Sequence, residues 1–409
     1  MNEILQEYAL LAVEKGVNIQ KGQLLVINCP VEHYEFARLC ANEAYKKGAG
    51  QVMIDYNDPI VSKMNYENVD IDVLKEVPDW FVSKRRYVID RKCAFLHIIS
   101  DYPGLLENID SSKLQAVQVE FMKKTDEFRA YTMNSIGQWT IVGLPNDVWA
   151  KKVFPDLEVS KAKEKLLEYI LKTSRVEKNK TISNWDTHNE ILFNTQELLN
   201  KYHFEALHFK NSLGTDLVVG LNPKHIWSGG ASPSTSGVVF NANIPTEEVF
   251  TMPKRTGVNG IVKATYPLNY QGKLIEDLCL EFKDGKVVSF DASKEKDTLA
   301  NLLKTDENAS YLGEVALISH NSPISNLKTM FYNTLYDENA SCHLALGAAY
   351  PTTMEGGVDI ANDKLIENEC NVSMVHSDFM FGSKCMNIVG IKADGSEVEV
   401  MLNGDIVIK

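Results

Sequence analysis

The sequence predicts two domains, an α/β domain with a mostly parallel sheet over residues 1–185 and an α+β domain with a mixed or antiparallel sheet over residues 186–409. Short apolar runs alternate with amphipathic segments through the first half, which is typical of a parallel sheet covered by helices. A polar stretch at residues 178–180 marks the seam. Beyond it the apolar runs become shorter and are separated by Gly, Pro and Asn. A chain of 409 residues is long enough for two hydrophobic cores.

The first half reads as helices and strands in turn. Residues 2–15 carry apolar side chains at helical spacing and end at Gly16, as a helix does. Apolar runs predict strands over residues 23–28, 51–55, 94–99 and 139–142, and helices are expected over residues 32–47, 146–153 and 160–174. Because no glycine-rich phosphate loop follows any of these strands, this half is interpreted as a scaffold.

The second half begins with a helix expected over residues 187–202. Strands are predicted over residues 206–209, 216–221, 238–242 and 260–265. A hairpin is expected over residues 278–290 with its turn at Asp284-Gly285, and another turns at Asp394-Gly395. Asp-Gly between apolar runs is a strong signal for a two-residue hairpin turn.

The net charge, the apolar runs and the cysteines of the chain indicate which kinds of partner and location to expect. The chain has 55 acidic and 42 basic residues, for a net charge of −13, which argues against nucleic acid or an anionic membrane as the partner. No apolar run is long enough to span a bilayer. The seven cysteines form no C-x-x-C pair, and an odd number in apolar runs favours reduced thiols and a cytoplasmic protein.

Three segments of the second half are dense in side chains that bind metal ions. The first contains Glu247 and Glu248 after a Pro-Thr turn, and the second contains Glu314 inside an apolar run. An unpaired buried carboxylate is costly, so Glu314 needs a cation, a donor or a raised pKa.

The third segment contains His343, Tyr350, His376 and Asp378. The helix formers around His343 predict that it lies on a short helix that ends at Gly347. His376 and Asp378 are two apart in a predicted strand, so they share a face about 7 Å apart.

Glu, His and Asp together form a mixed nitrogen and oxygen set that suits two divalent cations. Each motif alone is also typical of solvated charges or of structural pairs. The candidates are spread over about 130 residues, so spacing by itself leaves both readings open.

Longer motifs identify a family. The sequence resembles the aminopeptidase T family, also called the aminopeptidase S or thermophilic metalloprotease family, over essentially its full length. The resemblance rests on Asn243-Ile-Pro-Thr-Glu-Glu-Val-Phe-Thr-Met-Pro253, Gly313-Glu-Val-Ala-Leu317, the His343 segment, Tyr350-Pro351 and His376-Ser-Asp378. Lys254 departs from the pattern, where a histidine is expected, and this puts only the details of substrate subsites in doubt.

The resemblance implies a dimeric, metal-dependent aminopeptidase that acts on peptides with a free N-terminus. It implies two divalent ions, Zn²⁺ or Co²⁺ with Mn²⁺ or Mg²⁺ as alternatives. The implied metal ligands are Glu248, Glu314, His343, His376 and Asp378, with Tyr350 as a further active-site residue. Glu247 is the expected general base, although a structural role is an equal alternative. Two other functions stay open: a two-metal hydrolase of another amide or ester, and a non-catalytic metal-binding protein.

Overall fold

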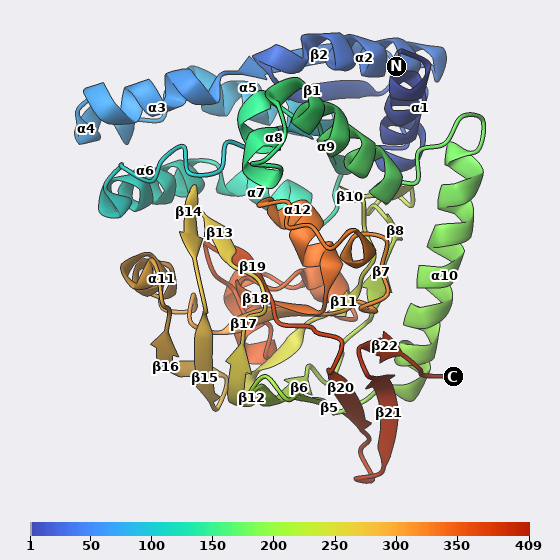
Figure 1. Cartoon of the computed structure of the whole chain (residues 1–409), viewed down its shortest axis with the longest axis vertical. Helices are drawn as coiled ribbons and strands as arrows, with labels where there is room; N and C mark the ends of the chain where they lie inside the picture. The colour runs from blue at the N-terminus through green and yellow to red at the C-terminus, as the bar shows by residue number, and fades with distance from the viewer. Residues whose placement is uncertain (1) are drawn as a thin grey trace. The chain divides into compact units, whose positions relative to one another are not determined.

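The computed structural model describes residues 2–409 of the chain (Figure 1). These residues form two compact units, of which the first comprises the chain up to Glu190 together with Gly230–Thr246. The second comprises Ile191–Gly229 and Glu247–Lys409. The predicted domains 1–185 and 186–409 stay a prediction, because compactness alone does not show which part folds independently.

The first unit is built on a five-stranded parallel sheet in the order β10-β4-β3-β1-β2. Its strands are β1 (Leu24–Pro30), β2 (Gln51–Asn57), β3 (Ala94–Ile99), β4 (Trp139–Gly143) and β10 (Asn243–Ile244). The predicted parallel sheet is therefore confirmed, with β10 added from a segment a hundred residues further along the chain. A small antiparallel pair, β8 (Ala231–Pro233) and β9 (Val239–Asn241), belongs to the same unit.

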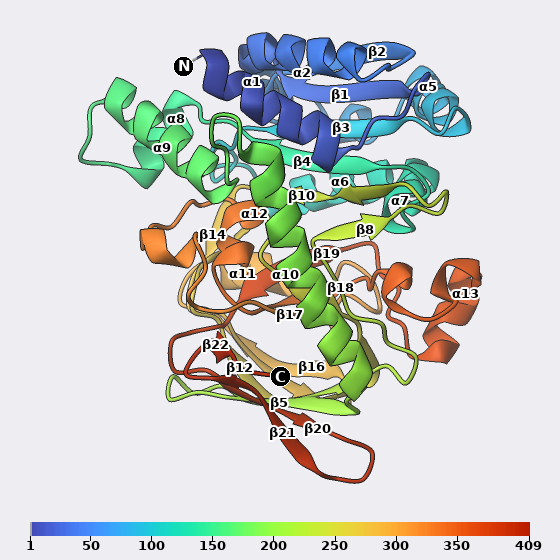
Figure 2. The same cartoon turned by 90° about the vertical axis from the view of Figure 1, so that its right-hand side faces the viewer.

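Helices cover both faces of this sheet. Figure 2 shows α1 (Asn2–Leu11) and α2 (Tyr34–Lys46) beside β1. On the other face, Val88 of α5 (Asp79–Asp90) and Tyr131 of α7 (Asp126–Met133) pack on Phe95 of β3. The remaining helices are η1 (Ala12–Gly16), η2 (Val31–His33), α3 (Pro59–Asn68), α4 (Ile71–Leu74), α6 (Ser111–Lys124), α8 (Asp147–Val153) and α9 (Val159–Thr173), and α10 (Thr181–Tyr202) runs from this unit into the second.

The second unit contains two large antiparallel sheets and a separate antiparallel pair, β13-β14. The eight-stranded sheet has the order β16-β15-β12-β6-β5-β20-β21-β22, and the five-stranded sheet has the order β19-β18-β17-β11-β7. Its strands are β5 (Ala206–Lys210), β6 (Asp216–Leu221), β7 (Ser228–Gly229), β11 (Val249–Thr251), β12 (Pro253–Lys263), β13 (Leu268–Tyr270), β14 (Lys273–Ile275), β15 (Cys279–Lys283), β16 (Lys286–Asp291), β17 (Leu312–Leu317), β18 (His343–Gly347), β19 (His376–Met380), β20 (Asn387–Ile391), β21 (Glu397–Leu402) and β22 (Asp405–Ile406).

Short helices link these strands: α11 (Lys296–Leu303), η3 (Ser325–Leu327), α12 (Thr334–Asp337), η4 (Glu338–Ala340), η5 (Pro351–Thr353), η6 (Gly357–Asp359), α13 (Asn362–Leu365) and η7 (Ile366–Asn368). The β15–β16 hairpin turns at Asp284 and Gly285, which have φ of 50° and 85°. Two successive residues at positive φ are what a tight hairpin turn needs, so this prediction is confirmed. No helix among residues 2–409 is long and apolar enough to cross a membrane.

The prediction of a helix around His343 is wrong. His343 begins β18, which pairs with β17 on one side and β19 on the other, and all five of its residues are buried. A short segment that is buried along its whole length has no periodicity that separates strand from helix. Pairing with two neighbouring strands decides the matter here, because it overrides the modest preference of Ala and Leu for helix.

Candidate metal centre

Three adjacent strands of the second unit bring the predicted site residues together. Across β17, β18 and β19, Glu314 lies opposite Ala345, which lies opposite Asp378. His343 and His376 are each two residues before a member of this row, so their side chains share its face. Ala345 stands in the middle with only a methyl group, which leaves room between the two carboxylates.

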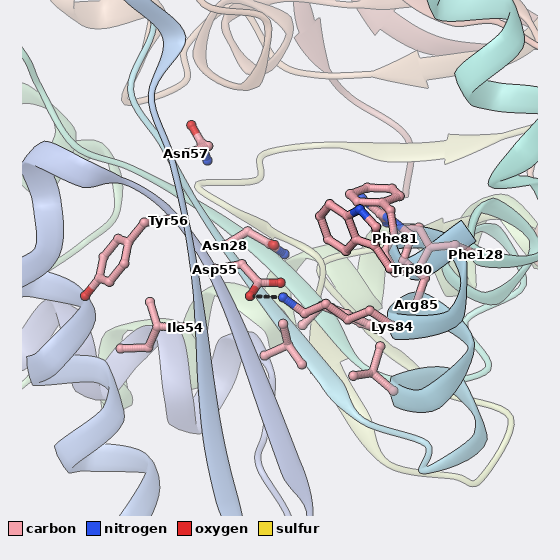
Figure 3. Close-up of a pocket in the computed structure, with 13 residues that line it drawn as sticks. Asn28, Ile54, Asp55, Tyr56, Asn57, Trp80, Phe81, Lys84, Arg85 and Phe128 are labelled. Atoms are coloured by element: carbon pink, nitrogen blue, oxygen red, sulfur yellow. Dashed lines mark hydrogen bonds and ion pairs between the residues drawn. The ribbon is translucent and has the colours of Figure 1, made fainter. Parts of the chain in front are cut away.

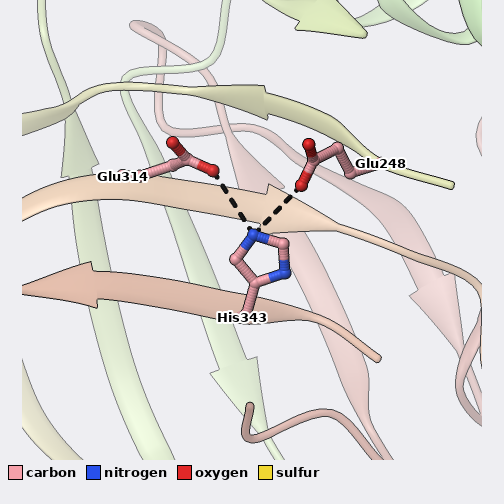
Figure 4. A group of neighbouring side chains, drawn as sticks. All are labelled: Glu248, Glu314 and His343. Atoms are coloured by element: carbon pink, nitrogen blue, oxygen red, sulfur yellow. Dashed lines mark hydrogen bonds and ion pairs between the residues drawn. The ribbon is translucent and has the colours of Figure 1, made fainter. Parts of the chain in front are cut away.

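His343 is at the centre of the first group of ligand-type atoms (Figure 4). Its Nε2 lies 3.1 Å from Oε2 of Glu248 and 3.3 Å from Oε1 of Glu314. Its other nitrogen, Nδ1, is 3.0 Å from the backbone carbonyl oxygen of Glu338, so it is the donor of that hydrogen bond. The imidazole therefore presents Nε2 to the two carboxylates, and the ring is only 1% exposed.

His376 is at the centre of a second group. Its Nε2 lies 3.6 Å from Oε2 of Glu314 and 3.4 Å from Oδ1 of Asp378. Its Nδ1 donates to the carbonyl oxygen of Ala348 at 2.7 Å. Both imidazoles are thus oriented by a backbone carbonyl, the usual way in which a protein fixes the tautomer of a metal-binding histidine.

The donor set fits divalent metal ions. Glu248, Glu314 and His343 each offer an atom within 4.8 Å of the others, and so do Glu314, His376 and Asp378. Oδ1 of Asp378 is buried, and its 3.4 Å contact with Nε2 of His376 is longer than an ordinary hydrogen bond. A buried carboxylate oxygen without a donor is costly unless a cation faces it. Imidazole nitrogen with carboxylate oxygen is a combination that suits zinc, cobalt and manganese.

The shifted pKa values of the cluster also support a site for divalent cations. Burial, followed by the nearby Asp378 and Glu248, raises the pKa of Glu338 well above its ordinary value, and burial also raises the pKa of Glu314. Burial lowers the pKa of His376, but Asp378 and Glu314 outweigh it and bring the pKa to about 9. Four carboxylates therefore surround two imidazoles, an excess of negative charge that divalent cations would neutralise.

Tyr350 and Glu247 lie at the margin of the cluster. The ring of Tyr350 makes an edge contact with the ring of His376, with 4.9 Å between their centroids. The backbone N–H of Glu247 donates to Oδ1 of Asn339 at 2.7 Å, and the Asn339 side chain also donates to Leu335. Asn339 thereby anchors the segment that carries Glu247, whose role as a base stays a prediction.

Sequence reasoning missed Glu338. This residue lies in η4, is 8% exposed, and interacts electrostatically with Glu248, Glu314, His343 and Asp378. Its position five residues before His343 was a signal, but an acidic residue next to Asp337 reads as a solvated charge. Only the burial of η4 makes it part of the site.

Comparison with known proteins identifies the family. The model of the thermophilic metalloprotease family matches residues 1–406. Aminopeptidase AmpS of Bacillus subtilis (strain 168) is 42% identical over 98% of each chain, and aminopeptidase 2 of Geobacillus stearothermophilus is 40% identical over 98% of this chain and 97% of its own. The structure of wild-type AmpT from Thermus thermophilus superposes with a TM-score of 0.91 at 35% identity, covering 100% of both chains.

A match over nearly the whole chain, relatives at this level of identity and a shared fold agree with one another. The chain belongs to the thermophilic metalloprotease family.

Proposed function

We propose that this protein is a metalloaminopeptidase with two divalent cations, which releases the N-terminal residue of peptides. One observation carries the proposal: Glu314 belongs to both groups of ligand-type atoms, with Glu248 and His343 on one side and His376 and Asp378 on the other. Paired ions in hydrolases lie about 3.5–4 Å apart, a separation that one carboxylate can bridge. Zn²⁺ or Co²⁺ suit the nitrogen and oxygen donors, and Mn²⁺ or Mg²⁺ are the alternatives.

Tyr350 is our candidate for stabilising the negative charge that develops during hydrolysis. When bound, the cations would polarise the scissile carbonyl and lower the pKa of a water molecule. Burial first, and then Glu314 and Asp378, raise the pKa of Tyr350 well above its ordinary value, so its hydroxyl keeps its proton at neutral pH. Tyr350 is therefore suited to donate a hydrogen bond to the oxygen on which negative charge develops.

Glu247 is our candidate for the proton acceptor. It adjoins Glu248, and its backbone is held by Asn339, which keeps it close to the proposed metal ligands. Glu338 is the competing candidate, since it is buried beside the same carboxylates. Its raised pKa keeps Glu338 protonated without metal, so it could accept a proton only if bound cations favour its ionised form.

The charge of the site supports recognition of a free amine. Once bound cations favour the ionised forms, Glu248, Glu314, Glu338 and Asp378 would carry more negative charge than the two histidines balance. A carboxylate that is left over once cations are bound would attract the α-ammonium group of a peptide. The named relatives are aminopeptidases, and we extend that activity to this chain on the basis of this site.

The test compares a leucyl amide that carries a chromogenic leaving group with its N-acetylated form, using the purified full chain with zinc or cobalt and with a chelator. We expect metal-dependent turnover of the free amine only. Equal turnover of the acetylated compound would indicate a general two-metal amidase or esterase. Metal binding without turnover of any such compound would favour a non-catalytic metal-binding protein. We further propose a homodimer in the cytoplasm, which sedimentation and cell fractionation would check.

A further inference from the structure

The first unit has a cavity of its own, apart from the metal centre. It has a volume of about 410 Å³ and lies at the carboxyl ends of β1 and β2, under α5. Asn28 and Asp55 form the side of the cavity next to the sheet, and Trp80, Arg85 and Phe128 line it from the helices (Figure 3). The carboxyl ends of parallel strands are where open α/β sheets bind ligands.

Arg85 forms no ion pair with any described residue, and only the more distant charge of Asp55 partly offsets its burial. Its guanidinium carbon lies 4.2 Å from the ring centroid of Phe128 and 4.7 Å from that of Phe81. Its Nε is buried and has no hydrogen-bond partner, and no carboxylate in residues 2–409 forms an ion pair with it. Stacking on aromatic rings recovers part of the lost hydration, but an unsatisfied buried N–H remains costly. Since Arg85 also lines the cavity, an anion there would supply the opposite charge that no ion pair provides.

The nearest carboxylate is already engaged. Asp55 forms an ion pair with Lys84, the residue that precedes Arg85 in α5. Lys84 and Arg85 against Asp55 leave one positive charge at the cavity, whereas the whole chain carries −13. Asn28 Nδ2 lies 3.3 Å from Nδ1 of His97, a ring that burial keeps neutral with a pKa of about 4, so this amide donates to the histidine and is held in place.

The surroundings favour a carboxylate over a phosphate. Phosphates in such sheets are usually held by backbone N–H groups at a helix N-terminus. Here the side chain of Asp58 already accepts from the N–H groups of Ile60 and Val61 at the start of α3. The planar fork of an arginine matches a carboxylate with two parallel hydrogen bonds.

Aromatic side chains define the rest of the ligand. The side chain of Trp80 is 68% exposed although it lines the cavity with Phe81 and Phe128. A cavity of this volume lies near the lower end of the range for small-molecule sites, which is about 300–1,000 Å³. We propose that this cavity binds a small organic carboxylate with an aromatic body, with the carboxylate on Arg85 and the ring against Trp80 and Phe128.

The experiment titrates phenylacetate into the full chain by calorimetry, in the presence of a chelator so that no metal ion can bind the carboxylate. Acetate, which lacks the ring, and 2-phenylethanol, which lacks the charge, are the matched probes. We expect phenylacetate to bind at least about tenfold more tightly than either of them. Absence of binding at about 10 mM phenylacetate would overturn the proposal, because the affinity would then be too low for a small-molecule site.

Variants locate the binding. Arg85→Gln should weaken phenylacetate binding about tenfold or more, the usual worth of hydrogen bonds to a charged group. Arg91→Gln is the matched control, because Arg91 stacks on Tyr87 at 4.4 Å but does not line the cavity. Trp80→Ala removes an exposed side chain, so it decides the case even if Arg85→Gln fails to fold. Unchanged affinity in either folded variant would refute the site.

Discussion

The shared position of Glu314 gives the sharpest test of the metal centre. Glu314 contributes one oxygen to each group of ligand-type atoms, whereas Asp378 contributes to one only. Glu314→Gln replaces a carboxylate with a poorer donor in both groups, and Asp378→Asn does so in one. We therefore expect Glu314→Gln to lose tight binding of both ions and Asp378→Asn to lose one.

The number of metal sites gives the expected loss in the free energy of unfolding. A ligand present at 100 times its Kd stabilises the folded state by about 2.7 kcal/mol per site. Two sites would then contribute about 5 kcal/mol, all of it lost in Glu314→Gln and about half of it lost in Asp378→Asn. Without metal, Glu314→Gln should instead stabilise the protein. The raised pKa of Glu314 means that its ionised form opposes folding at neutral pH, and the amide has no such charge.

Two measurements check this. Metal content after dialysis gives the number of ions bound, and unfolding with metal and with chelator gives the stabilisation due to metal. Glu281→Gln is the control, since Glu281 is an exposed glutamate on β15 and the change in charge is the same. If Glu314→Gln still binds two ions as tightly as Asp378→Asn binds one, the shared carboxylate is not a ligand and the reasoning fails.

Two further predictions concern the metal centre, and a third concerns the buried His225. Glu248→Gln should lower the metal content. Glu247→Gln should leave the metal content normal and lower kcat by roughly 10²–10⁴. Full activity in Glu247→Gln would show that Glu247 is not the base and would favour Glu338. Ala345→Leu should fill the space between Glu314 and Asp378 and abolish metal binding at a cost of about 1–3 kcal/mol in stability, whereas normal metal content in that variant would show that the space is not needed. His225 is 4% exposed, and burial lowers its pKa to about 4. Since the unfolded chain takes up this proton near pH 6.5 and the folded chain only near pH 4, stability should fall by about 3 kcal/mol as the pH drops through that window; unfolding at pH 6.5 and 4 should show a smaller loss in His225→Gln.

The sequence by itself predicted the features that depend on residues close together in the chain. Alternating apolar strands and helices predicted the parallel sheet of the first unit, and β1 to β4 lie where they were expected. Asp284-Gly285 predicted its hairpin, because few other residue pairs take two positive φ angles. The spacing of His376 and Asp378 placed both side chains on one strand face, and their nitrogen and oxygen atoms do lie 3.4 Å apart. These features depend only on neighbouring residues.

Only the tertiary structure decided which distant residues meet. His343 is in a strand because β17 and β19 pair with it, which no local propensity records. Glu338 belongs to the site because η4 is buried, and Glu314 is shared because the register of three strands sets it opposite Ala345 and Asp378. Register, burial and the desolvation of Arg85 arise from contacts between segments far apart in the chain, so a pattern of adjacent residues could not reveal them.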